Sequence, residues 1–351
     1  MSSVRELAKA LGVSAATVSR ALDGHPNVST ETRARIVAAA KAANYRPNSA
    51  ARRLSTGRSE IVSLVLPTEA GHFDEPLYIR LLHGIGRRLA AAGYDLSVLS
   101  ASPGAEEDAL YRRLVESRRA DGVIVVRTRW DDPRVTYLQS VDFPFVCMGR
   151  TNARQPYAFV DGDGEAAFAD ATRRILALGH RSLVHLAAPS AFCFSRYRRT
   201  GFARAMDEAG LEPRVCEIPA DGHAACAMAH ALLDGRDPPT AIVAATDRMA
   251  YGVLKCCAER GLVPGRDLSV IGHDNLTASA FTSPPLTTME LSFEATAEQL
   301  ASFMLARIDG EDPAALQAVQ PVAFLQGGTL AARRSAGAPD RPHDFEPTQR
   351  S

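Results

Sequence analysis

The sequence lacks the features that mark membrane-spanning and exported proteins. No apolar run approaches the roughly 20 residues that a membrane helix requires, and the chain opens on a polar, amphipathic stretch instead of an apolar signal segment. The six cysteines contain no C-x-x-C pair, so they fit neither a disulfide framework nor the usual zinc spacings. We therefore expect a cytoplasmic protein with reduced, mostly buried thiols, no metal and no membrane partner.

The motifs of common enzyme classes are also missing. The sequence contains no G-x-S-x-G, no Walker loop and no H-E-x-x-H, and its nine histidines are scattered. One partial nucleotide motif, G-x-G-x-x-A at residues 162–167, precedes a strand that ends HLAAP, without the acid that a dinucleotide site needs. We expect a helix-entry turn there, with Asp163 as its structural residue, and we predict neither a cofactor nor an enzyme.

Acidic residues are scarce in the N-terminal segment of the chain. The chain has 40 basic and 40 acidic residues, but residues 1–58 contain ten lysines and arginines and only three acids. This segment therefore has a net charge of +7, and the remainder has −7. A basic segment joined to an acidic body is typical of a DNA-binding module fused to a part that does not bind DNA. The length of 351 residues predicts two or three domains.

Residues 4–22 indicate two short helices joined by a tight turn. Gly12 suits the left-handed end of the first helix, and Ser14 is a good N-cap for the second. In the second helix, Val18 and Leu22 are four residues apart and are expected to face inward. The small outer face is predicted at Ala15, Ala16, Ser19 and Arg20. This pattern fits a DNA-reading helix-turn-helix, and an ordinary αα-hairpin is the alternative.

A third helix is predicted from Glu31 to about residue 44, capped by Ser29 and with Ile36, Val37, Ala40 and Ala43 on its apolar face. The basic segment at residues 45–58 follows, where Pro47 ends the helical pattern and Asn48 or Ser49 could cap a short helix. Such a helix is too short to be stable alone and could fold only on a partner. Its arginines suit phosphates and Leu54 suits a wedge between bases, whereas the alternative is a basic flexible linker.

From residue 60 the pattern alternates between strands and helices. Apolar, β-branched runs are expected as strands at residues 61–67, 94–101, 121–127, 143–149, 157–160, 182–188, 214–218, 240–246 and 268–274. Helices are expected at residues 76–92, 106–117, 165–178, 197–209, 224–233, 250–260 and 293–308. This alternation predicts two α/β lobes with parallel sheets, and a small ligand would bind in the cleft between them, near the carboxyl ends of the strands.

Several motifs occur in order along the chain. They are LAKALGVSAATVSRAL, VSTETRARI and YRPNSAARRL at the N-terminus, and LALGHRSLVHL, RRTGFARAMDEAGL, PTAIVAATDRMAYGVL, GLVPGRDLSVIGHDN and PPLTTM in the body. Through these motifs the chain resembles the lac repressor family (LacI/GalR-type regulators) over about 330 residues. The resemblance implies a small all-α helix-turn-helix head and a two-lobed α/β body like that of periplasmic sugar-binding proteins, with three crossovers between the lobes. The DNA-contacting residues expected from the pattern and the resemblance are Ser14, Ala15, Ala16, Thr17, Ser19, Arg20, Asn27, Asn48, Arg52 and Leu54.

The resemblance has consequences for DNA readout. It implies that Ala15, Ala16 and Arg20 face bases in the major groove, and that Leu54 pairs with its dimer mate in the minor groove of a palindromic operator. Alanine cannot hydrogen-bond a base, so Ala15 and Ala16 can only touch thymine methyl groups. Arg20 is the better candidate for direct readout. The tail lacks the leucine heptads of a tetramer, so we expect a homodimer.

The expected domain boundaries follow from these patterns. The head is expected at residues 1–46, the hinge at 47–59 and the body at 60–332. Within the body, the first lobe is expected at about 60–155 plus 288–320, and the second at about 156–287 plus 321–332. Residues 333–351 are rich in proline and polar residues and are predicted to be disordered.

Candidate effector-binding residues follow strands or lie on loops at the predicted cleft. Asp274 ends an apolar strand, where a carboxylate could accept two sugar hydroxyls or could instead cap a turn. Thr246 and Asp247 end the preceding strand, and Asp247 could cap the next helix. The family resemblance implies that Arg198 reaches into the cleft. The candidates are His72, Phe73, Arg127, Phe192, Phe194, Arg198, His223, Thr246 and Asp274.

We therefore expect a DNA-binding transcriptional regulator, with repression favoured over activation, controlled by a small carbohydrate effector. LPTEAGH resembles repressors of α-glucoside utilisation most closely, which favours a glycoside, and a purine-type effector is the alternative. A free sugar-binding protein would need an export signal and would not need the basic head. A sugar-converting enzyme would need catalytic carboxylates in the cleft.

Overall fold

The computed structural model describes residues 4–22, 27–43, 45, 57–68 and 76–333. The chain divides into two compact units, Met1–Glu60 and Ile61–Ser351, each with its own core. Several expected sites lie outside the described residues. These are the hinge residues Asn48, Arg52 and Leu54, the loop residues His72 and Phe73, and the predicted tail from residue 334 onward.

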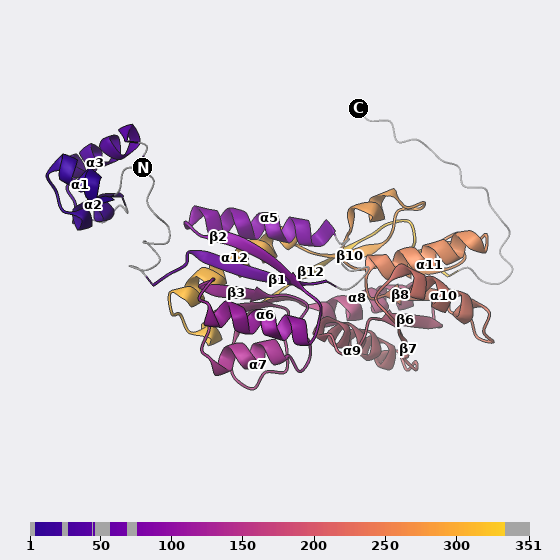
Figure 1. Cartoon of the computed structure of the whole chain (residues 1–351). Coiled ribbons are helices and arrows are strands. Elements are labelled where there is room, and N and C mark those ends of the chain that lie inside the picture. Colours follow the sequence, from indigo (N-terminus) through magenta and orange to yellow (C-terminus); the bar gives the residue numbers. More distant parts are fainter. Residues whose placement is uncertain (1–3, 23–26, 44, 46–56, 69–75, 334–351) are drawn as a thin grey trace, which may run out of the picture. The chain divides into compact units, whose positions relative to one another are not determined.

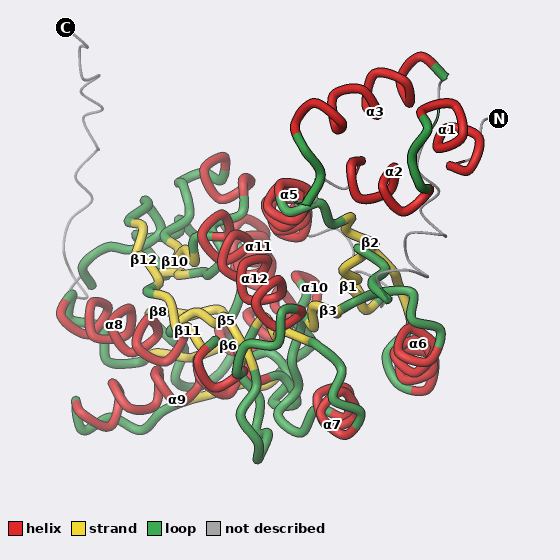
Figure 2. Tube along the Cα trace, turned by 90° about the vertical axis from the view of Figure 1, so that its left-hand side faces the viewer, coloured by secondary structure: helices red, strands yellow, loops and turns green. Residues whose placement is uncertain are grey.

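The first unit contains α1 (Val4–Leu11), α2 (Ala15–Leu22) and α3 (Thr30–Ala42), grouped around a shared centre in Figure 2. Gly12 has a φ of +66°, as the predicted turn requires. The Ser14 hydroxyl accepts from the Thr17 N–H at 3.0 Å, and the Ser29 hydroxyl accepts from the Thr32 N–H at 3.3 Å. The turn and both predicted caps are therefore confirmed.

One face of the third helix differs from the prediction. Ile36 and Ala40 are buried in the core of this unit, but Val37 is 47% exposed and Ala43 is also exposed. Ile36 and Ala40 are four residues apart and share a face, whereas the residue next to Ile36 points about 100° away from it. The core is completed from the other segments by Leu7, Ala8, Val18, Ala21 and Val28.

The first sheet of the second unit is parallel, in the order β11–β5–β4–β3–β1–β2. Its strands are β1 (Ile61–Pro67), β2 (Asp95–Ala101), β3 (Gly122–Val125), β4 (Phe145–Met148), β5 (Ala158–Gly162) and β11 (Gln317–Gln320). Helices α5 (Pro76–Ala91) and α12 (Phe293–Ile308) pack on one face, and α6 (Ala105–Glu116) and α7 (Pro133–Ser140) on the other. Figure 1 shows α5 and α6 on opposite sides of these strands.

The second sheet is also parallel, in the order β7–β6–β8–β9. Its strands are β6 (Leu183–Ala187), β7 (Arg214–Glu217), β8 (Ala241–Ala244) and β9 (Ser269–Ile271). Helices α10 (Gly222–Leu233) and α11 (Asp247–Glu259) cover one face, and α8 (Gly164–Ala177) and α9 (Cys193–Glu208) cover the other. Two short 3₁₀ turns, Thr277–Phe281 and Pro313–Ala315, complete the described elements.

Two strands lie in a different lobe from the one expected. The strand predicted at residues 157–160 was expected to open the second lobe, but β5 pairs with β4 and β11 in the first sheet. Strand β10 (Thr288–Leu291) pairs antiparallel with β12 (Val322–Leu325), and its Met289 packs in the core of the second lobe. Local sequence predicts that residues 157–160 form a strand, but it does not specify the neighbouring strands in the sheet. The lobe to which this strand belongs therefore could not be predicted from the order of the elements.

Candidate functional site

A pocket lies between the two sheets, where strands of both lobes end. Its first-lobe wall is formed by residues that directly follow β3 and β4 or end β5, and its second-lobe wall by α9 and by residues that follow β8 and β9. We call this the interlobe pocket. Its lining comprises Tyr78, Val126, Arg127, Thr128, Met148, Gly149, Asp161, Gly162, Gly164, Phe194, Tyr197, Arg198, Ala220, Thr246, His273, Asp274, Leu291, Phe293 and Val322.

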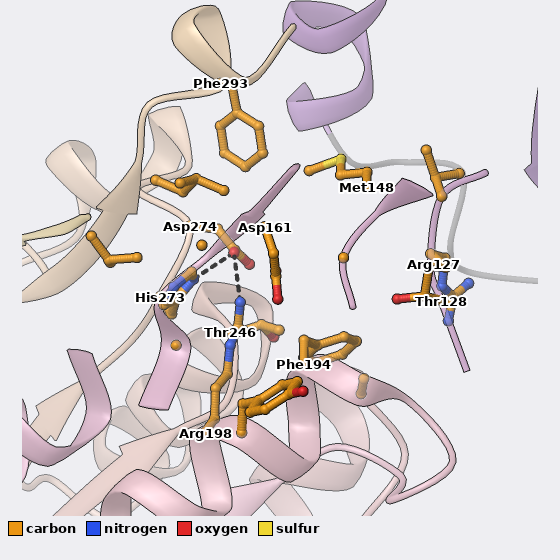
Figure 3. A pocket seen from close by; sticks show the side chains of 18 of the residues that line it. Arg127, Thr128, Met148, Asp161, Phe194, Arg198, Thr246, His273, Asp274 and Phe293 are labelled. Carbon is orange, nitrogen blue, oxygen red and sulfur yellow. Dashed lines mark hydrogen bonds and ion pairs between the residues drawn. The ribbon is translucent and has the colours of Figure 1, made fainter. Parts of the chain in front are cut away.

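The polar centre of the pocket is formed by Arg198, Asp274 and His273 (Figure 3). An Arg198 Nη2 lies 3.8 Å from Asp274 Oδ1, and the same oxygen lies 2.7 Å from His273 Nδ1. Arg198 Nη1 donates to the Ala245 carbonyl, which fixes the guanidinium on the second-lobe wall. A fixed cation and a carboxylate thus converge on one apolar cavity, which is the usual arrangement of a polar small-molecule site.

Burial sets the charge states at this centre. It raises the pKa of Asp274 to about 6, although the positive charge of Arg198 favours the ionised form. Burial, reinforced by Arg198, holds the pKa of His273 well below its ordinary value, so the imidazole is neutral. Asp274 therefore titrates close to neutral pH and can act as a hydrogen-bond acceptor in its ionised form.

Two predicted site residues, Asp274 and Arg127, are among the six described residues other than glycine that have a positive φ. Asp274 has a φ of 114° and Arg127 a φ of 52°, values that side chains other than glycine rarely adopt. Arg127 follows β3 and Asp274 follows β9, so both occupy the carboxyl ends of strands. Strained residues persist where the surrounding structure holds them, and they cluster at ligand sites.

The sequence offers Asp247 as a possible cap of the next helix, but the structure gives that role to Thr246. Thr246 is the N-cap of α11, and its hydroxyl accepts from the Met249 N–H at 3.3 Å while it lines the pocket. Asp247 is fully buried and accepts from the Leu276 N–H at 2.8 Å and from the hydroxyls of Ser279 and Thr288, each at 2.6 Å. Asp247 therefore holds together the segments that follow β9, and Thr246 faces the cavity.

Aromatic rings form the wall beside Arg198. The Phe194 ring lies 4.8 Å from the guanidinium carbon of Arg198 and stacks on Phe192 at a centroid distance of 5.7 Å. Phe192 does not line the interlobe pocket, and the guanidinium carbon of Arg127 lies 4.7 Å from its ring centroid. A flat apolar surface next to charged groups suits a ring that has polar substituents.

The structure places five of the predicted effector residues in the pocket lining: Arg127, Phe194, Arg198, Thr246 and Asp274. His223 does not belong to it. It lies in the first turn of α10 and is exposed, and Ala220, which precedes that helix, lines the cavity instead.

Sequence reasoning missed several lining residues, and Asp161 is the most informative. It ends β5, and its carboxylate accepts from Arg150 Nε at 2.7 Å, while Arg150 lies 4.0 Å from the ring of Tyr197. An acid at a strand's carboxyl end is the signal that identifies Asp274. Asp161 also lies at the carboxyl end of a strand, but it was not selected as a candidate, because residues 162–167 were interpreted as a helix-entry turn with Asp163 as the structural residue. Asp163 does cap α8, accepting from the Ala166 N–H at 3.0 Å.

In the head, the expected DNA-contacting face is accessible. Ser14, Ala16, Ser19, Arg20 and Asn27 are exposed, and Ala15 and Thr17 are half-buried. The half-burial of Ala15 follows from its packing against the core, and Thr17 bonds the Ser14 hydroxyl at 2.8 Å.

Asp274→Asn is expected to stabilise the protein in a pH-dependent way. A folded pKa of about 6, against an ordinary 3.8, means that the folded state binds more protons between these values. The carboxyl therefore opposes folding increasingly as pH rises, by roughly 2–3 kcal/mol above pH 6, and asparagine removes this penalty. The gain should fall by about half at pH 5.

Urea unfolding at pH 7.5 and pH 5 measures this difference. Asp207→Asn, an exposed aspartate on α9, is the control and should change stability little at either pH. A gain for Asp274→Asn that is equal at both pH values would contradict the assignment of a raised pKa.

Comparison with known families matches a separate family to each of the two structural units. Residues 3–48 match the family described as bacterial regulatory proteins of the lacI family, and residues 172–330 match the periplasmic binding protein-like domain. In the part of the chain that the structure describes, no helix is long and apolar enough to cross a bilayer.

Full-length relatives share both parts. The chain is 35% identical over 350 residues to the HTH-type transcriptional regulator AglR of Rhizobium meliloti (strain 1021), covering 96% of this chain and 95% of that protein. It is 32% identical over 331 residues to RafR of Escherichia coli, another HTH-type transcriptional regulator, covering 93% and 98%.

Solved structures agree in fold. The transcriptional regulator CelR–cellobiose complex superposes with a TM-score of 0.73 at 26% identity, covering 94% of this chain and all of that one. The lac repressor dimer bound to operator and the anti-inducer ONPF superposes with a TM-score of 0.81 at 24% identity, covering 94% and 99%. The helix-turn-helix head, the two-lobed body and the full-length relatives together establish that this chain belongs to the LacI family of bacterial regulatory proteins and is an HTH-type transcriptional regulator.

Proposed function

We propose that this regulator is controlled by a small carbohydrate, such as a glycoside, bound in the interlobe pocket. The observation that carries the proposal is the convergence of the Arg198 guanidinium and the Asp274 carboxylate beside the Phe194 ring. An ionised carboxylate can accept two sugar hydroxyls, a guanidinium can donate to ring or glycosidic oxygens, and an aromatic ring packs on the apolar face of a pyranose. CelR, a structural neighbour, is described in complex with cellobiose, which supports a saccharide here. The LPTEAGH segment favours an α-glucoside.

A purine-type effector is the second candidate. The Phe194 ring, which lines the pocket and is held by stacking on Phe192 with the two planes 15° apart, presents a flat apolar surface that would also suit a planar heterocycle. Asp274 could then accept from a ring N–H or an exocyclic amine.

Contacts between the lobes provide the route by which an effector would act on DNA affinity. The Trp130 N–H donates to the Ala191 carbonyl at 2.9 Å, and the Cys193 N–H donates to the Thr128 carbonyl at 3.1 Å. These bonds join the two lobes beside the pocket, so a ligand that changes the lobe arrangement must strain or reinforce them. A coupling of about 1–3 kcal/mol changes DNA affinity roughly 5- to 150-fold.

The remaining assignments follow from this scheme. We expect a cytoplasmic, nucleoid-associated homodimer that binds a palindromic operator, acts more readily as a repressor than as an activator, and has no enzymatic activity. A palindrome matches the two-fold symmetry of a dimer that presents two identical heads.

A ligand screen with the full-length protein tests the proposal. Melting temperature is measured against α- and β-linked disaccharides, monosaccharides, and purine bases and nucleosides, since a bound ligand raises it by mass action. Binding to a palindrome selected from random duplexes is then measured with and without each hit. A saccharide that shifts both the melting temperature and the DNA affinity supports the proposal. A response to purines alone would replace it with the second candidate, and turnover of a saccharide would contradict the absence of enzymatic activity.

Arg20→Ala is expected to weaken binding to the selected palindrome by about 1–3 kcal/mol, because Arg20 is an exposed residue of α2 suited to bidentate contacts with guanine. Gel-shift titrations on this duplex and on a scrambled duplex measure the effect. Arg5→Ala, an exposed arginine of α1, is the matched control. If Arg20→Ala weakens both duplexes equally, Arg20 contacts phosphate and reads no base.

A further inference from the structure

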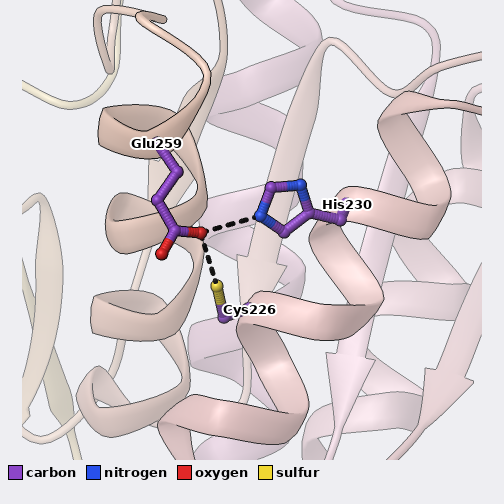
Figure 4. A group of neighbouring side chains, drawn as sticks. All are labelled: Cys226, His230 and Glu259. Carbon is purple, nitrogen blue, oxygen red and sulfur yellow. Dashed lines mark hydrogen bonds and ion pairs between the residues drawn. The ribbon is translucent and has the colours of Figure 1, made fainter.

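A cluster of metal-ligating side chains lies outside the interlobe pocket, between α10 and α11. It consists of Cys226, His230 and Glu259, shown in Figure 4. Cys226 and His230 are four residues apart on α10, so they share one face of the helix, and Glu259 is the last residue of α11. We call these three residues the α10–α11 cluster.

The three side chains already point at one position. Glu259 Oε2 lies 2.9 Å from His230 Nε2 and 3.6 Å from Cys226 Sγ, and the three ligand atoms lie within 4.8 Å of one another. Tetrahedral zinc, with bonds of about 2.0–2.3 Å, places such ligand atoms about 3.4–3.6 Å apart. The separation between Glu259 and Cys226 matches this spacing, whereas Glu259 and His230 lie at hydrogen-bond distance and would have to move apart by roughly 0.5 Å to admit an ion.

The chemistry of the donor set selects the class of metal. A thiolate and an imidazole are borderline-soft ligands, which favour Zn²⁺ over Mg²⁺ or Ca²⁺. The Cys226 side chain is buried, His230 is half-buried and Glu259 is exposed, so an ion can enter from the Glu259 side and a water can occupy the fourth position. We propose that the α10–α11 cluster is a binding site for zinc or a similar borderline transition metal, and that the metal joins α10 to α11.

Neighbouring charges set the cost of filling the site. Lys255 forms an ion pair with the other carboxylate oxygen of Glu259, Oε1, so Oε2 is the oxygen that faces Cys226 and His230. Two groups must change on binding. Cys226 must give up its thiol proton to bind as a thiolate. When Nε2 of His230 binds a metal, Nδ1 carries the proton, so its 3.4 Å contact with Arg260 Nη1 must break.

The metal would act on the second lobe. Helix α10 begins two residues after Ala220, and α11 begins directly after Thr246, and both of these residues line the interlobe pocket. A metal that joins α10 to the last residue of α11 would therefore stabilise the wall of the pocket without occupying it.

Metal titration of tag-free, full-length protein in a non-thiol reductant tests the proposal. After chelator treatment, Co²⁺ should give a thiolate-to-cobalt charge-transfer band that reaches its maximum at one equivalent, and Zn²⁺ should abolish that band and raise the melting temperature. Cys226→Ser should remove the band, and His230→Ala and Glu259→Gln should each weaken Zn²⁺ binding at least about tenfold.

Matched variants make the result specific. Cys216→Ser changes a half-buried thiol on β7, and His223→Ala changes an exposed histidine on the same helix as His230, and both should bind metal like the unmodified protein. The absence of a charge-transfer band, or binding that survives both Cys226→Ser and His230→Ala, would overturn the proposal. In that case the cluster is an ion-pair network that holds α10 and α11 together without a metal.

Discussion

Arg134→Met is expected to lower the free energy of unfolding by about 3–5 kcal/mol, because it breaks a buried ion-pair network from one side. The Arg134 side chain is 1% exposed, and its guanidinium donates to Asp132 at 2.7 and 2.9 Å and to Glu107 at 2.8 Å. Methionine fills much of the same space but leaves both buried carboxylates without this cation. The penalty arises from their uncompensated charge more than from lost packing.

The same substitution is also expected to weaken effector binding in the interlobe pocket. Arg134 also donates to the carbonyls of Val126 and Arg127, at 3.2 and 3.1 Å, and these two residues line the pocket where β3 ends. Without these bonds, the strained backbone of Arg127 loses a support, so effector affinity should fall together with stability.

Chemical unfolding measures the loss, and two further variants identify its cause. Arg129→Met removes the second partner of Glu107, which lies 2.8 Å from it, but Arg129 is 25% exposed and its loss should cost about 1 kcal/mol. Combining Arg134→Met with Glu107→Met should restore part of the stability, because it removes one of the two stranded charges. A double variant less stable than Arg134→Met alone would show that packing dominates the effect.

Arg198→Ala is expected to weaken binding of the effector identified in the screen by about 100-fold, or about 2.7 kcal/mol. Its guanidinium is the cation at the polar centre of the pocket, held between the Ala245 carbonyl, Asp274 and the Phe194 ring. Operator affinity without effector should stay within about twofold, so a repressor with this substitution would no longer respond to its effector.

Calorimetric titration and operator-binding assays measure the two affinities. Arg199→Ala, the exposed neighbouring arginine on α9, is the matched control and should respond normally. Arg198→Lys retains the charge but loses the planar fork, so it should recover only part of the affinity. Unchanged effector binding by a well-folded Arg198→Ala protein would show that Arg198 does not contribute to effector binding, which would contradict the proposed site.

Features set by neighbours in the sequence were predictable. Ser14 and Ser29 cap the helices that follow them, Gly12 has the left-handed conformation of the predicted turn, and α12 has the expected bounds of residues 293–308. Each depends on hydrogen bonds or hydrophobic spacing within one or two helical turns, and such interactions are specified by a few adjacent residues.

Features set by distant pairing were not predictable to the same degree. Strand β5 was identified but placed in the wrong lobe, because its pairing is with β4, across a loop, and with β11, which follows the whole second lobe in the chain, and local sequence specifies neither partner. This error also hid Asp161, whose role depends on the sheet to which its strand belongs. In the same way, Val37 was assigned to the core from spacing, and the packing of α3 left it exposed.

The α10–α11 cluster illustrates the same division. Cysteine spacing predicted no metal site, and the i, i+4 pair of Cys226 and His230 was visible in the sequence without a third ligand. Only the packing of α11 beside α10 brings Glu259, 29 residues beyond His230, within 2.9 Å of that histidine. The sequence by itself determined the family, the head and the identity of Arg198 and Asp274 as candidates. The tertiary structure decided which residues share a cavity, because strand order and helix packing depend on contacts between residues far apart in the chain.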